Sequence, residues 1–180
     1  NQTASDGSPL EIIDYYQFVM GDYFKTMGVP IVAGRSFEPA DAASPGRVVI
    51  VNETLANRIW KGRNPIGQRL RPNLSTAIGF GGDSWHTVIG VAKDVKQGGV
   101  EKETGTELYV SLDQLAMAAP TMNVVMRTIL PPAALSRTLE RLVREVDPAV
   151  PIVRLRDMES VFAESIRRPR LLAQLLGAFA

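Results

Sequence analysis

The stretch RVVIVNETLANRIW, residues 47–60, joins a strand to a capped helix. Its first five residues, Arg47–Val51, form a β-branched run that is typical of a buried strand. Asn52 is a favoured N-cap residue, so a helix from Glu53 to about Trp60 is expected to begin directly after it. Leu55, Ile59 and Trp60 share one face of that helix. The stretch therefore predicts a buried strand that leads directly into an amphipathic helix.

Outward from this stretch, the first two thirds of the chain predict further short strands and one short helix. Leu10–Met20 is dense in β-branched and aromatic residues and predicts a strand. Asp22–Met27 predicts a short helix that Gly28 ends in the left-handed conformation. Other strands are expected at 29–32, 68–71, 85–95 and 107–110. Residues 1–9 are polar and turn-rich, which indicates a flexible lead-in.

Strand, helix and strand follow one another between Asn123 and Leu155. The strands are expected at 123–128 and 152–155, and the helix from Pro131 to Val146. We expect this helix to bury an apolar stripe against the two strands; the stripe consists of Leu135, Leu139, Leu142 and Val146. A last helix is expected from about Asp157. With the strand-rich first part, this βαβ-like unit predicts the α+β class.

Gly34-Arg35-Ser36-Phe37 makes a tight corner between two extended segments, and the acidic residue Asp41 follows shortly after it. Glycine adopts backbone conformations that other residues avoid. We therefore expect such a conformation at Gly34, with Arg35 turned back toward Asp41.

Composition excludes several classes of protein. The chain has 180 residues, enough for one ordinary domain or two small lobes, and its formal net charge is +1. A chain with so little net charge lacks the excess of positive charge that is typical of nucleic-acid-binding proteins. Cysteine is absent, which excludes disulfides and thiolate metal sites.

No catalytic, cofactor-binding or metal-binding constellation is visible in the sequence. The single histidine, His86, would need carboxylates close in space to act as a base or a metal ligand. Gly79-Phe80-Gly81-Gly82 lacks the strong preceding strand and following helix of a phosphate loop, and favours a flexible loop. The scattered aspartates lie beside turns, as helix caps do: Asp41, Asp94, Asp113 and Asp157.

The chain ends with the basic segment Arg167-Arg168-Pro169-Arg170 and the mostly apolar run Leu171–Ala180. Spanning a bilayer takes about 20 apolar residues, more than this run contains. One interpretation is a domain cut from a membrane protein where a transmembrane helix begins. The alternative is an amphipathic C-terminal helix that docks on the domain's own core.

Several short motifs follow one another from about residue 20 to residue 180. They are Tyr23-Phe24 with Gly28; Gly34-Arg35 with Phe37 and Asp41; Asn52-Glu53; Pro65-Ile66-Gly67; Gly90 in a Val-Ile-Gly-Val strand; and Arg168-Pro169-Arg170 before the apolar run. In order and spacing they resemble the MacB-like periplasmic core domain of bacterial ABC transporter permeases, of the FtsX-like permease family.

This resemblance implies two lobes. A porter-like βαβ lobe would be built from residues 10–30 and 115–168, and a smaller sabre-like lobe, residues 31–114, would be inserted between them. Residues 169–180 would begin a transmembrane helix that the chain end truncates, with Arg168, Pro169 and Arg170 at the membrane junction.

The resemblance also implies a function. The chain would be a non-catalytic periplasmic domain at the inner membrane, relaying conformational change driven by cytoplasmic ATP hydrolysis to substrate export or partner proteins. Its partners would be the membrane helices of the same permease and, indirectly, an ATPase domain or subunit; a periplasmic adaptor and a second permease domain are further candidates. No cofactor is implied.

Two other functions stay open. The chain could be a periplasmic binding module that captures a hydrophobic ligand, peptide or lipoprotein, or docks an adaptor. A groove between the lobes, lined by Trp60, Trp85 or nearby aliphatic residues, would favour this role. An enzyme would need a buried carboxylate pair, or His86 in a cleft.

Overall fold

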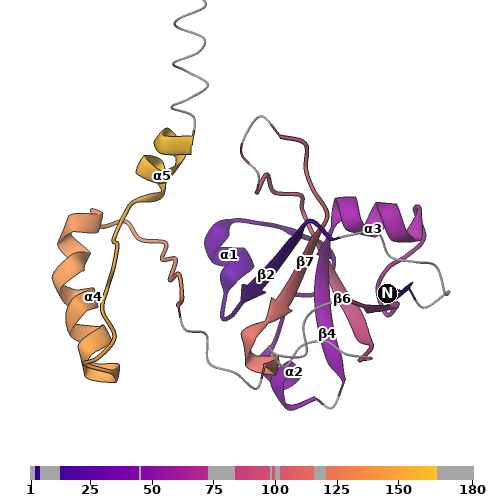
Figure 1. Cartoon of the computed structure of the whole chain (residues 1–180), viewed down its shortest axis with the longest axis horizontal. Helices are drawn as coiled ribbons and strands as arrows, with labels where there is room; N and C mark the ends of the chain where they lie inside the picture. The colour runs from indigo at the N-terminus through magenta and orange to yellow at the C-terminus, as the bar shows by residue number, and fades with distance from the viewer. Residues whose placement is uncertain are drawn as a thin grey trace, which may run out of the picture. The chain divides into compact units, whose positions relative to one another are not determined.

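The computed structural model describes residues 3–4, 13–44, 46–72, 84–97, 99, 102–115 and 121–165. The chain divides into two compact units (Figure 1). The first comprises residues 1–98 and 102–126, and the second comprises residues 99–101 and 127–180.

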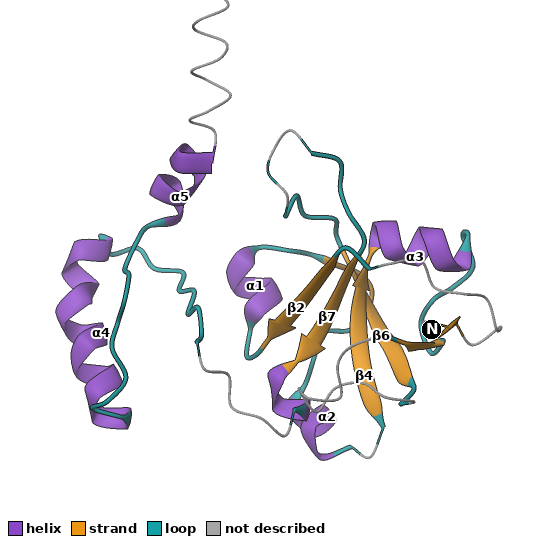
Figure 2. Ribbon diagram, in the orientation of Figure 1, coloured by secondary structure: helices purple, strands orange, loops and turns teal. Residues whose placement is uncertain are grey.

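The first unit is built on a mixed sheet. In the described residues its strands are β1 Thr3–Ala4, β2 Tyr15–Val19, β3 Ile31–Gly34, β4 Arg47–Asn52, β5 Arg69–Arg71, β6 His86–Ala92 and β7 Glu107–Ser111. The order is β1-β5-β6-β4-β7-β2, and β3 also pairs with β6. The pairs β4–β6 and β2–β7 are parallel, whereas the other pairs are antiparallel. The strand-rich first part and the α+β class are as predicted (Figure 2).

Short helices connect the strands. They are α1 Tyr23–Met27, α2 Pro39–Ala43, α3 Glu53–Trp60 and the 3-10 helix Leu112–Gln114. Gly28 ends α1 at φ 71°, in the left-handed region that the sequence predicts. Helix α3 has the predicted bounds, because the Asn52 side chain accepts the Leu55 N–H and so satisfies a free donor of the first turn. Helix α2 was not predicted.

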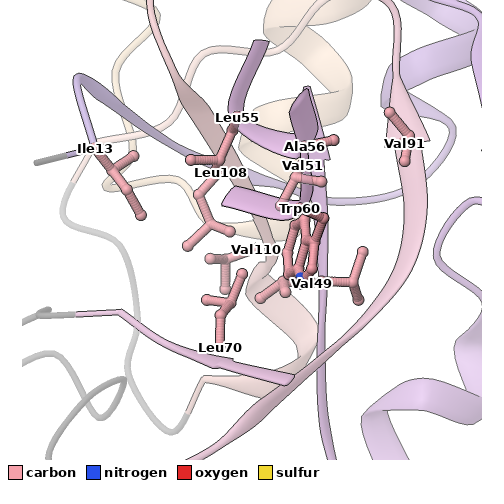
Figure 3. Close-up of a cluster of buried hydrophobic side chains, with 11 residues drawn as sticks. Ile13, Val49, Val51, Leu55, Ala56, Trp60, Leu70, Val91, Leu108 and Val110 are labelled. Atoms are coloured by element: carbon pink, nitrogen blue, oxygen red, sulfur yellow. The ribbon is translucent and has the colours of Figure 1, made fainter. Parts of the chain in front are cut away.

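Hydrophobic residues cover both faces of the sheet. On one face, Leu55, Ala56 and Trp60 of α3 pack with side chains of β4 and β7, including Val49 and Leu108 (Figure 3). The opposite face carries a second cluster, in which Phe24 of α1 packs with Ile50 and Tyr109. Because β4 contributes to both clusters, Val49, Ile50 and Val51 are all fully buried. This explains why its sequence is continuously apolar rather than alternating.

The second unit contains α4 Pro132–Val146 and α5 Met158–Ser165. Both helices are where the sequence predicts them, but the two expected strands at 123–128 and 152–155 are wrong, since both segments lack regular secondary structure. A strand is held by hydrogen bonds to a neighbouring strand, and none pairs with either segment among the described residues.

The predicted burial of the α4 stripe is also wrong in part. Leu135 and Leu139 are half-buried, whereas Leu142 is 46% exposed and Val146 is 89% exposed. The two strands that were expected to cover the stripe do not form in the described part of the chain, so the apolar surface predicted for it is missing there.

The sheet crosses the predicted boundary between the lobes at residue 30. Strand β2, from the segment expected in the porter-like lobe, pairs along its length with β7, from the segment expected in the inserted lobe. Two residues of the expected lead-in, Thr3–Ala4, pair with β5 as β1. The expected start of a membrane helix at 169–180 lies outside the described residues. Within the described part of the chain, no helix has the length and apolar character needed to cross a membrane.

The core predicts a large contrast between two identical substitutions in the first unit. Val51→Ala removes buried carbon atoms from the central strand β4, whereas Val32→Ala acts on a side chain that is 48% exposed. We expect Val51→Ala to lower the free energy of unfolding by about 2–3 kcal/mol and Val32→Ala by less than about 0.5 kcal/mol. Urea unfolding followed by tryptophan fluorescence measures both. Equal losses would show that β4 is not the centre of the core.

Candidate functional site

The predicted corner at Gly34 is confirmed. Gly34 has φ 71°, in the left-handed region. The Arg35 guanidinium donates two hydrogen bonds to the Asp41 carboxylate, with N–O distances of 2.8 and 2.7 Å. The same carboxylate accepts the Glu38 N–H at 2.8 Å, at the start of α2. The Arg35 guanidinium, whose hydrogen bonds favour the charged form, holds the pKa of Asp41 below its usual value. The corner is therefore closed by a charged hydrogen-bonded pair.

Two glycines of the predicted motifs face each other where β3 meets β6. Gly34 and Gly90 are partners in the antiparallel register. A Cβ atom on Gly90 would lie 2.3 Å from the Arg35 carbonyl oxygen, and one on Gly34 would lie 2.1 Å from the Ile89 carbonyl oxygen. Only glycine therefore permits this approach of the two backbones.

The remaining motif residues shape turns and aromatic packing. Gly67, at φ 81°, donates its N–H to Val88 at 2.8 Å, so the Pro65–Gly67 turn is bound to β6. The rings of Tyr23 and Phe24 contact the Tyr109 ring, with the Phe24 and Tyr109 centroids 4.9 Å apart, and the Phe37 ring contacts Phe24. These residues hold the first unit together.

At the carboxyl end of β4, Asn52 and Glu53 bind three neighbouring segments. The Asn52 Oδ1 accepts the N–H groups of Leu55 at 3.0 Å and of Glu107 at 2.9 Å. Its Nδ2 donates to the Gly105 carbonyl at 2.8 Å. The Glu53 carboxylate lies 3.0 Å from the Lys93 ammonium, just beyond β6. The residues predicted as a strand-to-helix motif thus also fix β6 and β7.

A buried acid outside the predicted motifs, Glu107, completes this polar end of the sheet. Glu107 is 1% exposed, and its carboxylate accepts the Tyr109 hydroxyl and the Gln97 amide, each at 2.7 Å. Burial raises the pKa of Glu107, although hydrogen bonds from Tyr109, Gln97 and Gln17 oppose this shift. Burial, followed by the hydrogen bond to Glu107, also raises the pKa of Tyr109. Glu107 and Tyr109 are two apart in a strand, so their spacing places them on one face.

An apolar pocket of about 590 Å³ lies beside this network, within the first unit. Its walls come from the end of β2, from α1, from Leu112 and Leu115, and from residues 121–125. Gln17 and Tyr23 connect the pocket to the network, since Gln17 bonds the Glu107 carboxylate and Tyr23 contacts the Tyr109 ring. A pocket of this size can hold a small molecule or a few side chains.

The histidine and the two tryptophans lie away from the pocket. His86 is fully buried in the sheet, and burial, followed by the charge of Arg47, lowers its pKa to about 4. Trp60 belongs to the core under α3. The Trp85 ring instead contacts the guanidinium carbons of Arg69 and Arg71, at 5.5 and 5.6 Å from its centroid. Neither tryptophan lines the pocket beside β2 and α1.

Two other kinds of site were considered in the sequence: a metal site and a junction with a membrane helix. Among the described residues, no three or more acidic or histidine side chains are grouped so that they could hold a metal ion. The expected membrane junction at Arg168, Pro169 and Arg170 lies outside the described residues.

Comparison with known proteins gives a family and two structural likenesses. A sequence model of the family described as "MacB-like periplasmic core domain" matches residues 3–160. The periplasmic region of MacB from Actinobacillus actinomycetemcomitans is similar with 19% identity and a TM-score of 0.47, over 69% of this chain and 52% of that chain. The extracellular domain of the ABC-type transporter YknZ from Gram-positive bacteria is similar with 19% identity and a TM-score of 0.48, over 74% of this chain and 64% of that chain. The chain thus spans less than two thirds of either solved region. No curated protein matches the sequence.

The glycine pair predicts another matched contrast. Gly90→Ala would place a methyl group against the Arg35 carbonyl oxygen. The new methyl group could not move away easily, because it would also lie 3.3 Å from the Ile50 side chain. We expect a loss of about 1–3 kcal/mol or more in the free energy of unfolding. Gly46→Ala is the control, because its nearest neighbour would be 3.9 Å away, and we expect a change within about 0.5 kcal/mol. A Gly90→Ala protein as stable as the control variant would disprove the close approach.

The Arg35–Asp41 pair predicts a pH dependence of stability. A carboxyl group whose folded pKa is lowered contributes stability above its unfolded pKa of about 4, and this is lost as pH falls through the folded pKa. We expect Asp41→Asn to cost about 1–2 kcal/mol at pH 7, at the low end for charged hydrogen bonds because Arg35 is 42% exposed. The difference between wild type and Asp41→Asn should shrink below about pH 4. Urea unfolding from pH 7 to pH 2.5 measures it, and a constant difference would contradict the assignment.

Proposed function

The chain belongs to the family of MacB-like periplasmic core domains, and on this premise we propose that it is a non-catalytic periplasmic domain of an ABC transporter permease. In this role it relays conformational change, driven by ATP hydrolysis in the cytoplasm, to substrate export or to partner proteins. The family match over residues 3–160 is the observation that carries the proposal.

The division into two units supports a mechanical role. The first unit has a continuous sheet with a core on each face. Residues 121–130, which lead from the first unit to α4, form neither helix nor strand. A segment without a hydrogen-bonded ladder deforms more easily than a sheet. Movement imposed through the membrane helices would therefore act on this connection and leave the first unit unchanged.

The arrangement into a porter-like lobe from residues 10–30 and 115–168 and a sabre-like lobe from residues 31–114 remains part of the proposal. So do its partners: the membrane helices of the same permease, reached through Arg168, Pro169 and Arg170, an ATPase acting from the cytoplasm, and a periplasmic adaptor or second permease domain.

A second candidate function is a periplasmic binding module for a hydrophobic ligand, a peptide or a lipoprotein, or for docking an adaptor. The apolar pocket beside β2 and α1 favours this function. The two functions are compatible, because a domain that moves can also bind.

Distances between spin labels test the mechanical role. The 180 residues contain no cysteine, so labels can be attached here to Lys61→Cys in the first unit and Arg137→Cys in the second, after replacement of any cysteine elsewhere in the permease. In the full-length permease, reconstituted in lipid nanodiscs, we expect pulsed electron paramagnetic resonance to show different distance distributions with and without ATP and vanadate. Labels at Lys25→Cys and Lys61→Cys, both in the first unit, form the control pair and should show no change. Identical distributions for the first pair under all nucleotide conditions would refute the relay.

A further inference from the structure

The apolar pocket beside β2 and α1 has walls that can receive a flexible apolar chain. Val124, Met122 and Met20 line it, and these side chains are 75%, 53% and 48% exposed, so they meet solvent instead of the core. Methionine side chains are flexible and polarisable, and they adapt to apolar groups of irregular shape. The pocket volume of about 590 Å³ lies within the range of about 300–1,000 Å³ for small-molecule sites.

Two other side chains of the pocket wall are held in place by the buried network beside it. Gln17 hydrogen-bonds the Glu107 carboxylate. The Tyr23 ring contacts the rings of Phe24 and Tyr109, with centroid separations of 5.3 and 6.1 Å. This part of the wall is therefore formed before a ligand binds, which lowers the entropic cost of binding.

One acidic residue gives the pocket a charge preference. Among the described residues that line the pocket, only Asp22 carries a charge. It is exposed, and its side chain does not cap α1. Lys25, the basic residue next in sequence, is not among the residues that line the pocket. A carboxylate attracts a cation and repels an anion, so the pocket suits an apolar molecule with one positive charge.

Tyr23 adds a second attraction for a positive charge. It is next to Asp22 in the chain and also lines the pocket. Burial, followed by the charge of Glu107, raises the pKa of Tyr23, so its hydroxyl group stays uncharged near neutral pH. The face of an aromatic ring attracts cations, and quaternary ammonium groups are recognised in this way. Asp22 and Tyr23 together therefore favour a cationic group at this end of the pocket.

We propose that this pocket binds cationic amphiphiles, which are molecules with one apolar chain and one positively charged head. The chain lies against residues 121–125 and the end of β2, and the head lies at Asp22 and Tyr23. Burial of the chain provides most of the affinity, and Asp22 selects against neutral and anionic heads. The inference names the ligand class for the second candidate function and rests on that function, whereas the mechanical role does not depend on it.

Four amphiphiles, each used below its micellar concentration, test the proposal with the 180-residue protein. Decyltrimethylammonium, decyl maltoside and decanoate have apolar chains of similar length and differ in charge, whereas hexyltrimethylammonium has the same head and a shorter chain. Calorimetric titration in low-salt buffer measures each affinity. We expect decyltrimethylammonium to bind about two- to fivefold more tightly than decyl maltoside, and decanoate to bind most weakly. The shorter chain should weaken binding by at least about tenfold.

Nuclear magnetic resonance of protein labelled at the methionine methyl groups shows where the ligand binds. Met20 and Met122 line the pocket, whereas Met158 lies in the second unit and does not. We expect decyltrimethylammonium to shift the signals of Met20 and Met122 in a saturable way and to leave the Met158 signal unchanged. Substitution of each methionine by leucine assigns the signals.

Asp22→Asn separates the charge from the shape of the pocket. It removes the negative charge at nearly constant size, at an exposed position. We expect about two- to fivefold weaker binding of decyltrimethylammonium, tighter binding of decanoate and unchanged binding of decyl maltoside. Glu103→Gln is the matched control, because it removes an exposed acid of the first unit that does not line the pocket, and all affinities should stay as in the wild type.

The outcomes distinguish this inference from the functions proposed above. No saturable binding of any amphiphile, or binding that does not shift Met20 and Met122, would overturn both the inference and the second candidate function at this pocket. Equal affinity for the three heads, or wild-type affinities in Asp22→Asn, would overturn the inference alone and leave a pocket for apolar ligands. The relay is tested separately, by the nucleotide-dependent distances between spin labels.

Discussion

The side-chain amide of Asn52 is the interaction on which the first unit depends most. It accepts the N–H groups of Leu55 and Glu107 and donates to the Gly105 carbonyl, and it is fully buried. One side chain thus joins the end of β4 to the first turn of α3 and to the start of β7. A buried amide without partners would cost several kcal/mol, so these three segments are positioned together or not at all. These three hydrogen bonds therefore position both the helix α3, which covers the core, and the buried acid Glu107.

The buried polar groups at this end of the sheet follow the same requirement. Among the described residues, the Glu107 carboxylate accepts hydrogen bonds from the neutral groups of Tyr109, Gln97 and Gln17. Satisfying one carboxylate therefore fixes side chains from β2, from β7 and from the segment after β6. Such a network contributes more to a single defined arrangement than to net stability, because the carboxylate is costly to bury. It also places Gln17 at the wall of the pocket.

What the sequence predicts well is what local chemistry determines. The Asn52 cap, the left-handed Gly28 and the Arg35–Asp41 corner each involve residues close together in the chain. The strands expected at 123–128 and 152–155 depend on distant parts of the chain, because a strand forms only where another segment pairs with it. The apolar composition of a segment does not show which segment that would be. Glu107 was missed for a related reason. Its spacing from Tyr109 was visible, but Gln97, Gln17 and Asn52 approach it only through the fold.

The contrast between the two units has a physical basis in how their backbones are held. Where β3 pairs with β6, Gly34 and Gly90 bring the two backbones so close that no Cβ atom fits between them. On the other side of β4, the hydrogen bond between Asn52 and Glu107 holds β7 in place. The first unit therefore has few ways to deform without breaking hydrogen bonds inside a packed core. In the second unit, α4 has 15 residues and one of its stripe residues, Val146, is 89% exposed. Low-energy fluctuations concentrate where few apolar contacts and few backbone ladders oppose them. The proposed relay would use this contrast: the packed first unit would move as an intact body, and the segment 121–130, which has no regular secondary structure, would absorb the change.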